Sequence, residues 1–263
     1  MHLIDFISPL IRIFLVILVL VAIEWWRPFR AAKKNWRRYS VNFALTVCTI
    51  IIFTVCFFGI ALAIQRVIEN EWGLLQRVKL SSWLVILISF LVLDGVTYLA
   101  HVLLHKVPLF WSLHRLHHSD VMVDVSTSFR QHPLEALLRL VFLGLAATVF
   151  GVPLAVIALY RLLSSFNALL EHANIYTPLW FDRWISWFWV TPRMHKIHHS
   201  NRPLETDSNY GNLLSLFDRL LHSFTSVTQA NTVIYGLGER GLPSSPTASG
   251  LASNSGNPGT PWH

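Results

Sequence analysis

Long apolar runs separated by short charged stretches dominate the first two thirds of the chain. The first three runs cover residues 4–23, 41–64 and 83–104, and the second contains no charged residue. A helix of about 20 residues crosses a hydrocarbon core of about 30 Å, so each run predicts one membrane helix. The first run lacks a small-residue cleavage site, which favours a retained helix over a signal peptide.

A fourth apolar stretch, residues 136–170, is too long for one crossing. As a single helix it would extend about 52 Å, far beyond the core of the bilayer. Gly151 and Pro153 lie near its middle, where they favour a turn. The stretch therefore predicts a helical hairpin that turns at residues 151–153 and crosses twice.

Two later segments have different patterns. Residues 180–190 are rich in aromatic side chains and interrupted by charges, which predicts a short amphipathic helix at the membrane surface rather than a crossing. Residues 239–263 are rich in Ser, Gly and Pro and are expected to be a disordered tail. No internal repeat and no glycine-rich nucleotide loop is found.

The composition supports a membrane protein. Hydrophobic residues make up 53% of the chain and charged residues 13%, against about 25% charged residues in ordinary soluble domains. Both cysteines, Cys48 and Cys56, lie in one apolar run, which argues against a disulfide framework and a thiolate metal site.

The formal charge of +7 is concentrated in residues 27–38, which contain six arginines and lysines. Such a run can indicate nucleic-acid binding, but between two membrane helices it favours a cytoplasmic loop near anionic headgroups. No nucleic-acid partner is expected. If each helix and each arm of the hairpin crosses once, every histidine group described below lies on this cytoplasmic side.

Nine of the thirteen histidines form four groups with helical spacing. The groups are His101 and His105; His114, His117 and His118; His172; and His195, His198 and His199. Residues three or four apart share one face of a helix, so each multiple group can direct its imidazoles to one place. Neutral imidazole binds iron, zinc, copper and nickel. Nine such ligands exceed the needs of one ion and predict a pair of metals.

Other polar residues near these groups are weaker candidates. His132 could be a ligand, an outer partner of a ligand, or a structural partner of Arg130 and Glu135, whereas His2, His222 and His263 are expected to have ordinary roles. Six acids could accept hydrogen bonds from ligand imidazoles, or could instead cap helices or pair with arginines. They are Asp94, Asp120, Glu135, Glu171, Asp207 and Asp218.

The order and spacing of these motifs over residues 90–222 resemble the sterol desaturase/fatty acid hydroxylase superfamily. The motifs are LDGVTYLAHVLLHKVPLFWSLHRLHHS, RQHPLE, EHAN, PRMHKIHHS and DSNYGNLLSLFDRL. The resemblance identifies the three multiple groups as the histidine boxes of that superfamily and His172 as its additional histidine. Some relatives have a further histidine four residues earlier, where this chain has Ala168.

The resemblance implies a membrane-bound, non-haem di-iron oxygenase that hydroxylates or desaturates a lipid with O₂. No fused haem domain is evident, so an external electron-transfer protein is expected to supply electrons. Zinc could replace iron in the purified protein, because zinc binds such ligands more tightly than ferrous iron.

Two other classes of function are open. A membrane metal transporter or metal-binding protein is disfavoured because its ligands would be expected near mid-membrane and in repeated halves. A zinc hydrolase is disfavoured because no HExxH motif is present.

Together these patterns predict an all-α integral membrane bundle of about three long passes plus a helical hairpin, with a histidine-rich helical cap on the cytoplasmic face. The expected division is residues 1–80 for N-terminal membrane helices and the basic loop, 81–238 for a histidine-box catalytic domain, and 239–263 for the tail.

Overall fold

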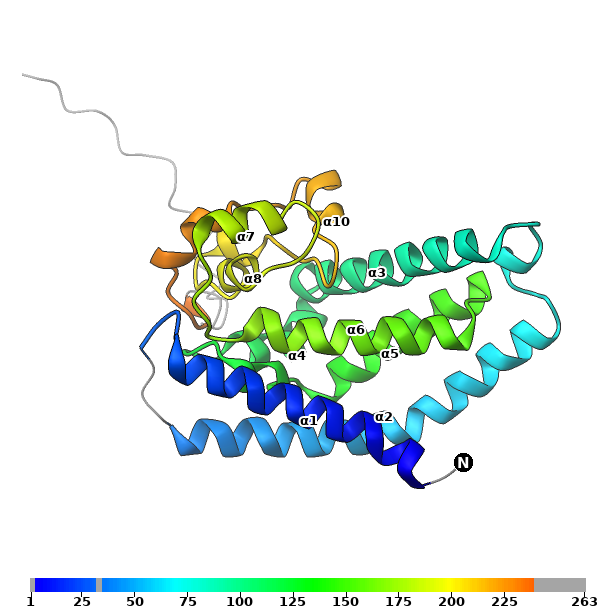
Figure 1. Ribbon diagram of the computed structural model, residues 1–263, viewed down its shortest axis with the longest axis horizontal. Coiled ribbons are helices and arrows are strands. Elements are labelled where there is room, and N and C mark those ends of the chain that lie inside the picture. Colours follow the sequence, from blue (N-terminus) through cyan, green and yellow to red (C-terminus); the bar gives the residue numbers. More distant parts are fainter. Residues whose placement is uncertain (1–2, 32–34, 239–263) are drawn as a thin grey trace, which may run out of the picture.

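The protein is built from helices throughout the part that the structure describes. The computed structural model describes residues 3–31 and 35–238, and this part contains no β-strand (Figure 1). The long helices are α1 (Leu3–Trp26), α2 (Trp36–Glu69), α3 (Ser82–Lys106), α5 (Pro133–Phe150) and α6 (Leu154–His172). The predicted all-α fold is therefore confirmed. The predicted tail, residues 239–263, lies outside the described residues.

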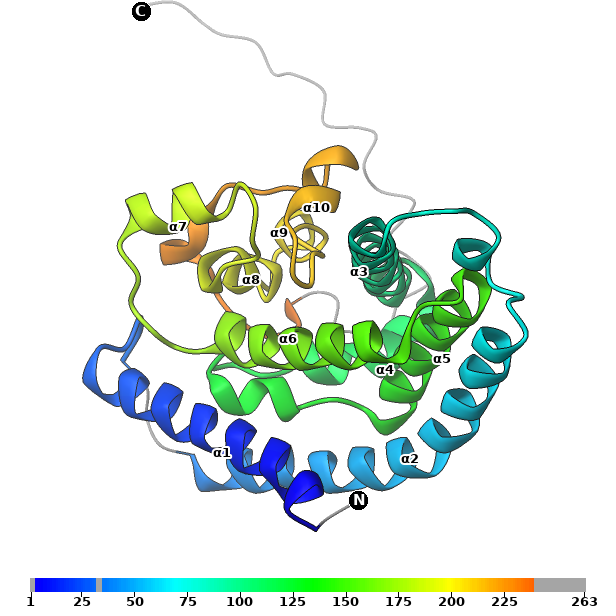
Figure 2. The same ribbon diagram turned by 45° about the vertical axis from the view of Figure 1, so that its right-hand side comes forward.

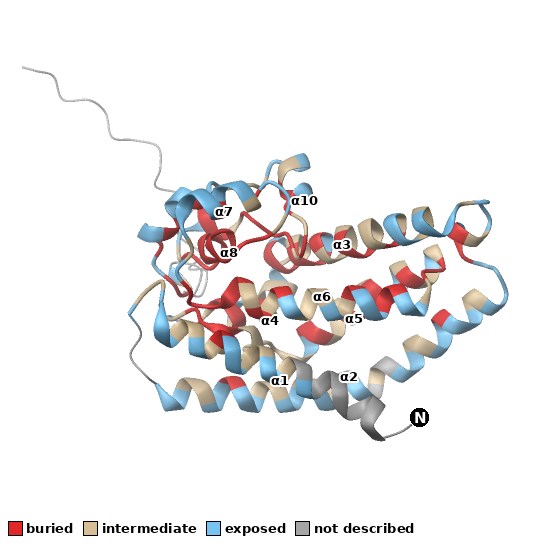
Figure 3. Cartoon of the chain, viewed as in Figure 1, coloured by how far each residue is buried: buried red, intermediate tan, exposed pale blue. Residues whose placement is uncertain are grey.

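Three helices, α3, α5 and α6, are long and apolar enough to cross a membrane. They coincide with the apolar run 83–104 and with the two arms of the hairpin. Helices α1 and α2 lie along the outside of the bundle and expose large apolar side chains, among them Phe14, Phe43 and Phe58 (Figure 3). Such side chains are suited to contact with lipid. That α1 and α2 also cross the membrane stays a prediction.

The predicted hairpin turn is confirmed at Gly151. Helix α5 ends at Phe150, Gly151 has a φ of +66°, and α6 begins three residues later at Leu154. Only glycine adopts this left-handed conformation without steric cost. Gly73, in the loop between α2 and α3, packs against Gly151 so closely that neither position has room for a Cβ atom. The loop and the hairpin turn therefore lie together at one end of the bundle.

Short helices and loops form a cap at the opposite end, where α3 and α6 end (Figure 1). The elements of the cap are α4 (Pro108–His118), η2 (Val125–Phe129), α7 (Leu179–Ile185), α8 (Pro192–His198), α9 (Pro203–Thr206), α10 (Leu216–Leu220) and η3 (Val227–Thr232). The remaining short helix, η1 (Leu74–Gln76), lies in the loop between α2 and α3. In Figure 2, α8 lies next to the end of α6 and faces α3 across the cap. All of α8 is buried (Figure 3).

The aromatic segment forms a shorter helix than the sequence predicts. Helix α7 stops at Ile185, Trp189 then pairs with Leu214 in an isolated bridge, and α8 begins at Pro192. Trp180, Trp184 and Trp187 remain largely exposed, at 72%, 62% and 59%. Their location at the membrane surface stays a prediction.

Two arginines of the basic stretch between α1 and α2, both among the described residues, bind to the cap. Arg30 donates to the backbone carbonyls of Ala230 and Val233. Arg38 forms ion pairs with the buried carboxylates of Asp120 and Asp124. These two arginines therefore stabilise the cap, a role that the sequence pattern of the run does not indicate.

Candidate metal centre

The nine clustered histidines all come together inside the cap and are all buried. They form two sets, and within each set the candidate ligand atoms lie within 4.8 Å of one another. The first group contains His101, His105, His114, His118 and His198, and the second group contains His117, His172, His195 and His199. Each of these buried groups could hold a metal ion, and the number of ions bound stays a prediction.

Each HxxHH box contributes to both groups. On α4, His114 and His118 belong to the first group and His117 to the second. The third box reverses this division, because the pair four residues apart, His195 and His199, joins the second group while His198 joins the first. Residues four apart share a helix face and the intervening histidine points elsewhere, so one short box can serve two neighbouring ions.

In the second group the Nε2 atoms of the four imidazoles converge. The Nε2 atoms of His172 and His117 are 3.0 Å apart, those of His195 and His172 are 2.9 Å apart, and those of His199 and His195 are 3.1 Å apart. Ligands at a metal–nitrogen distance of about 2.1 Å are separated by roughly 3.0 Å in octahedral and 3.4 Å in tetrahedral geometry. The observed spacing suits nitrogen atoms that share one ion.

Hydrogen bonds on the other side of the rings fix which nitrogen carries the proton. The Nδ1 atom of His117 donates to the carbonyl of Arg130 at 3.1 Å, and that of His172 donates to the carbonyl of Ala168 at 2.6 Å. Because a carbonyl only accepts, each Nδ1 is protonated and each Nε2 presents a lone pair. Two lone pairs that face one another repel unless a cation lies between them. The donor set therefore fits a metal ion.

The first group is arranged in the same way. The Nδ1 atom of His101 donates to the carbonyl of Tyr210 at 2.9 Å, and that of His198 donates to the carbonyl of Ser208 at 2.8 Å. The Nε2 atoms of these two rings are buried and have no hydrogen-bond partner among the described residues. Buried acceptors without partners are rare, and here they point into a set of five histidines.

The histidines are held in the form that binds metal. Burial, the largest cause in each case, lowers the pKa of every histidine on α4 and α8 and of His199, which follows α8, below the usual value of 6.5. Desolvation disfavours the charged imidazolium. These rings are therefore neutral at physiological pH, as ligation requires.

Three of the predicted acids lie beside the histidines. Glu135 accepts from Nδ1 of His114 at 2.9 Å, and a carboxylate oxygen of Asp207 lies 3.4 Å from Nδ1 of His105. Glu171 has a carboxylate oxygen 3.8 Å from Nε2 of His195, on the side where the second group converges. Glu135 and Asp207, which face Nδ1 atoms, can orient imidazoles and increase their basicity, whereas Glu171 faces the nitrogen that would bind metal.

Asp94 and Asp218 act on the chain segment that follows the third box. Asp94 accepts from the backbone N–H groups of Leu213 and Leu214 at 3.2 and 3.0 Å. Asp218 accepts from the backbone N–H of Tyr210 at 2.7 Å, and the carbonyl of Tyr210 is the acceptor for His101. Both carboxylates therefore fix the backbone around the centre rather than a histidine ring.

His132 lies outside both groups. It is the N-cap residue of α5, and its Nδ1 accepts from the backbone N–H of Leu134 at 3.2 Å. The structure thus gives the His132 side chain a helix-capping contact with Leu134, which differs from the structural partners that the sequence suggested, Arg130 and Glu135.

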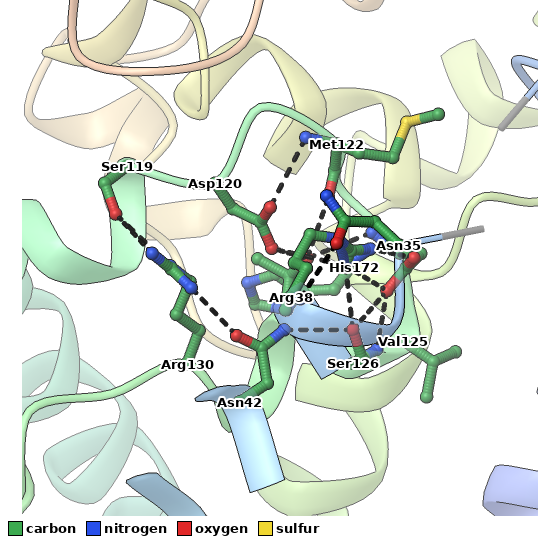
Figure 4. A network of polar contacts seen from close by, with 12 residues as sticks. Asn35, Arg38, Asn42, Ser119, Asp120, Met122, Val125, Ser126, Arg130 and His172 are labelled. Atoms are coloured by element: carbon green, nitrogen blue, oxygen red, sulfur yellow. Dashed lines mark hydrogen bonds and ion pairs between the residues drawn. The ribbon is translucent and has the colours of Figure 1, made fainter. Parts of the chain in front are cut away.

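A polar network around Asp120 supports the second group, and the sequence pattern does not reveal it (Figure 4). Asp120 accepts from Thr127 at 2.9 Å and pairs with Arg38, which also donates to Ser126 at 2.9 Å. Asn42 connects Ser126 to the guanidinium of Arg130, and the carbonyl of Arg130 accepts from His117. The contacts of Arg38 and Asn42 in this network join residues more than eighty positions apart, so no local spacing signals them.

A cavity opens beside the two groups. Its lining includes three histidines of the second group, His117, His172 and His195, but only His101 of the first. The remaining lining comes mainly from α3, α5 and α6, the helices that are able to cross a membrane. Many of these lining side chains are polar or charged, among them Thr97, Glu135 and Asn212.

Comparison with known proteins identifies the family to which the chain belongs. The fatty acid hydroxylase family matches residues 86–223, which include all nine histidines. The chain belongs to the fatty acid hydroxylase family. This confirms the resemblance to the sterol desaturase/fatty acid hydroxylase superfamily.

Similar proteins in this family act on lipids. The chain is 25% identical to the alkylglycerol monooxygenase of Caenorhabditis elegans over 81% of its length, and 29% identical to that of Xenopus tropicalis over 89%. It is 30% identical to the ornithine lipid hydroxylase OlsE of Rhizobium tropici over 53% of its length. These alignments cover 43%, 50% and 41% of the respective relatives, so the chain spans about half the length of the proteins it matches. No solved structure matches the chain.

Proposed function

We propose that this protein is a membrane-embedded oxygenase that hydroxylates a lipid with O₂, using two iron ions held by the nine histidines. The observation that carries the proposal is the convergence of nine buried imidazoles into two groups beside a cavity that the membrane-type helices line. Membership of the fatty acid hydroxylase family and the lipid substrates in the names of its relatives support it.

Bound iron would supply the chemistry that activates O₂ for oxidation of an unactivated C–H bond. Overall, the lipid, O₂, two electrons and two protons would give a lipid alcohol and water. The chain itself supplies the remaining requirements. Backbone carbonyls and Glu135 hold the rings in fixed tautomers, so the Nε2 atoms stay directed inward. The buried cap excludes bulk water, which protects a reactive centre from side reactions.

Hydroxylation is preferred over desaturation because the similar proteins are named as monooxygenases or hydroxylases. Electrons would come from a separate redox protein. The centre would lie on the cytoplasmic side, where such donors occur. This orientation is supported by Arg30 and Arg38 of the basic stretch, which contact the cap that contains α4 and α8.

The test combines lipid analysis with metal analysis of the full chain in membranes. Cells that produce the protein under ¹⁸O₂ should contain a lipid that gains one labelled oxygen, and the purified protein should bind two metal ions. His117→Ala and His198→Ala, one from each group, should each lose product and metal. His222→Asn is the matched control, because His222 is exposed, lies outside both groups and has a φ of +56° that asparagine tolerates.

Several outcomes would contradict the proposal. Full metal content and turnover in both alanine variants would remove the two-metal centre. A product that loses two hydrogens would change hydroxylation to desaturation. Unchanged lipids together with altered metal uptake would support a metal transporter, and a reporter fused after Phe224 that is found outside the cytoplasm would reverse the orientation.

A further inference from the structure

Two arginines lie inside the hairpin that the apolar pattern predicts. Arg139 is on α5 and Arg161 on α6, and both line the cavity that reaches His117 and His172. At 1.5 Å per residue, Arg161 lies about 10 Å from the start of its helix and about 16 Å from His172. Charged groups at such depth are costly and usually mark a functional site. The proposed oxidation step does not require them.

The charges around the cavity are unevenly distributed. The acids Glu135 and Glu171 lie on the histidine side, where they approach His114 and His195. Away from the histidines, a second cavity between α2, α5 and α6 shares Gln131, Arg139 and Arg161 with the first. The rest of its lining is Thr49, Ile50, Thr54 and Ala136, so among the described residues it has two cations and no carboxylate.

Arg139 retains hydrogen-bonding capacity towards this region. Its Nε donates to Glu135 at 3.0 Å, and its two terminal nitrogens make no hydrogen bond to any residue of the described chain. The side chain is 25% exposed. A guanidinium with free terminal nitrogens can bind a carboxylate or a phosphate with two parallel hydrogen bonds.

Thr49 provides an independent observation. Nearby threonines satisfy their hydroxyls within their own helix, as Thr46 donates to the carbonyl of Asn42 at 2.9 Å and Thr54 to that of Ile50 at 2.8 Å. The hydroxyl oxygen of Thr49 is buried and has no partner within residues 3–31 and 35–238. It lines the cavity that contains both arginines. A buried hydroxyl without a partner is costly, which indicates a polar occupant at this place.

We propose that Arg139 and Arg161, with Thr49 beside them, bind an ionised carboxylate or phosphate of the lipid substrate. This assignment rests on the proposed function and defines its substrate class as lipids with an anionic group. Because the arginines and three histidines of the second group line one cavity, a lipid whose anionic group is bound at the arginines could extend its chain to the histidines.

The test measures binding, so that it does not depend on turnover. The full-length protein, loaded with zinc and reconstituted in a neutral detergent at pH 8, is titrated with two pairs of ligands. Hexadecanoate is compared with hexadecanol, and hexadecylglycerol phosphate with hexadecylglycerol. The anionic member of at least one pair should bind about tenfold more tightly, and the favoured pair identifies carboxylate or phosphate.

Arg161→Gln should remove this preference and leave the affinity for the neutral member unchanged. Arg183→Gln makes the same charge change on exposed α7, outside both cavities, and should keep the preference. Thr49→Val, which leaves every charge in place, should weaken binding of the anionic lipid about threefold and keeps the test informative if Arg161→Gln does not fold.

Equal affinity within both pairs, or an undiminished preference in Arg161→Gln, would overturn the assignment. Displacement of neutral and anionic lipids alike by inorganic phosphate would also overturn it, because the site would then bind phosphate rather than a lipid. Lipid oxidation without a charge preference would contradict this assignment alone. A charge preference without any oxidation would contradict the proposed function and leave the anion site in place.

Discussion

The substitution Glu135→Gln isolates the effect of one carboxylate on the first histidine group. Glu135 is 1% exposed, and one of its oxygens accepts from Nδ1 of His114 at 2.9 Å, from Nε of Arg139 at 3.0 Å and from Gln131 at 3.1 Å. Glutamine preserves the shape and one acceptor oxygen, but it removes the negative charge. The Nδ1–H of His114 then loses its charge-assisted acceptor.

The expected size of the effect follows from these contacts. A hydrogen bond to a charged partner contributes about 1.5–3 kcal/mol and one between neutral groups about half as much. The loss of about 1 kcal/mol at His114 corresponds to a roughly fivefold to tenfold weaker metal affinity in the first group. The second group should change little, because its contacts at Arg130 and Ala168 are with backbone carbonyls.

Competition with a chromophoric chelator measures both affinities. Zinc is removed stepwise from the purified protein, and the two dissociation constants are fitted for the unmodified chain, Glu135→Gln and the control Glu69→Gln. Glu69 ends α2 and is exposed, so the control makes the same chemical change away from the centre. Unchanged affinity at both sites in Glu135→Gln, or equal weakening at both, would refute the assignment of Glu135 to His114 and the first group.

Further predictions concern the turn, the cap and the protonation of the centre. Gly151→Ala should destabilise the protein by about 1–2 kcal/mol from the positive φ alone, seen as a lower melting temperature, whereas Gly59→Ala, with open space at its Cβ, should be neutral or stabilising. Arg38→Gln should weaken zinc binding in the second group through the network that holds the backbone at His117, while Arg37→Gln, one residue earlier and exposed, should not. His132→Ala should keep two metal ions and lose about 1 kcal/mol of stability with its helix cap, and loss of one ion would instead make it a ligand. The metal-depleted protein should lose stability as the pH falls below about 6.5, because histidines in the unfolded chain then bind protons while the buried, neutral histidines of α4 and α8 do not. The free energy of unfolding should fall with a limiting slope of about 1.4 kcal/mol per pH unit for each such histidine. A free energy of unfolding, measured by urea titration, that is unchanged between pH 8 and 5.5 would contradict this.

The features that the sequence predicts well are those that depend on neighbouring residues. Apolar runs locate α3 and both arms of the hairpin, and Gly151 marks the turn because its backbone conformation is a local property. The spacing within each histidine box is also local, so the residue order alone is enough to infer a shared helix face. The number of clustered histidines then indicates two metals.

The features that the sequence could not predict depend on contacts across the fold. The sequence predicts Asp94 and Glu135 equally as hydrogen-bond acceptors for the histidines. In the structure Glu135 contacts His114, whereas Asp94 accepts from the backbone of Leu214, 120 positions away. Arg38 belongs to a run of charges, and such runs usually face solvent. In this protein Arg38 forms an ion pair with buried Asp124 in the cap. The division of the nine histidines between two groups likewise depends on how α4 and α8 pack, and neither box contains that information.

The unequal size of the two groups indicates which of them meets the substrate. The first group has five histidines and contributes only His101 to the lining of the cavity, so a metal held there would be largely enclosed by imidazoles. The second group has four, and three of them line the cavity. Ala168, the position at which some relatives have a further histidine, also lines it and leaves that side without an imidazole. Since a metal that activates O₂ needs an open coordination position, we expect O₂ and the lipid to approach the pair of metals from the side of the second group.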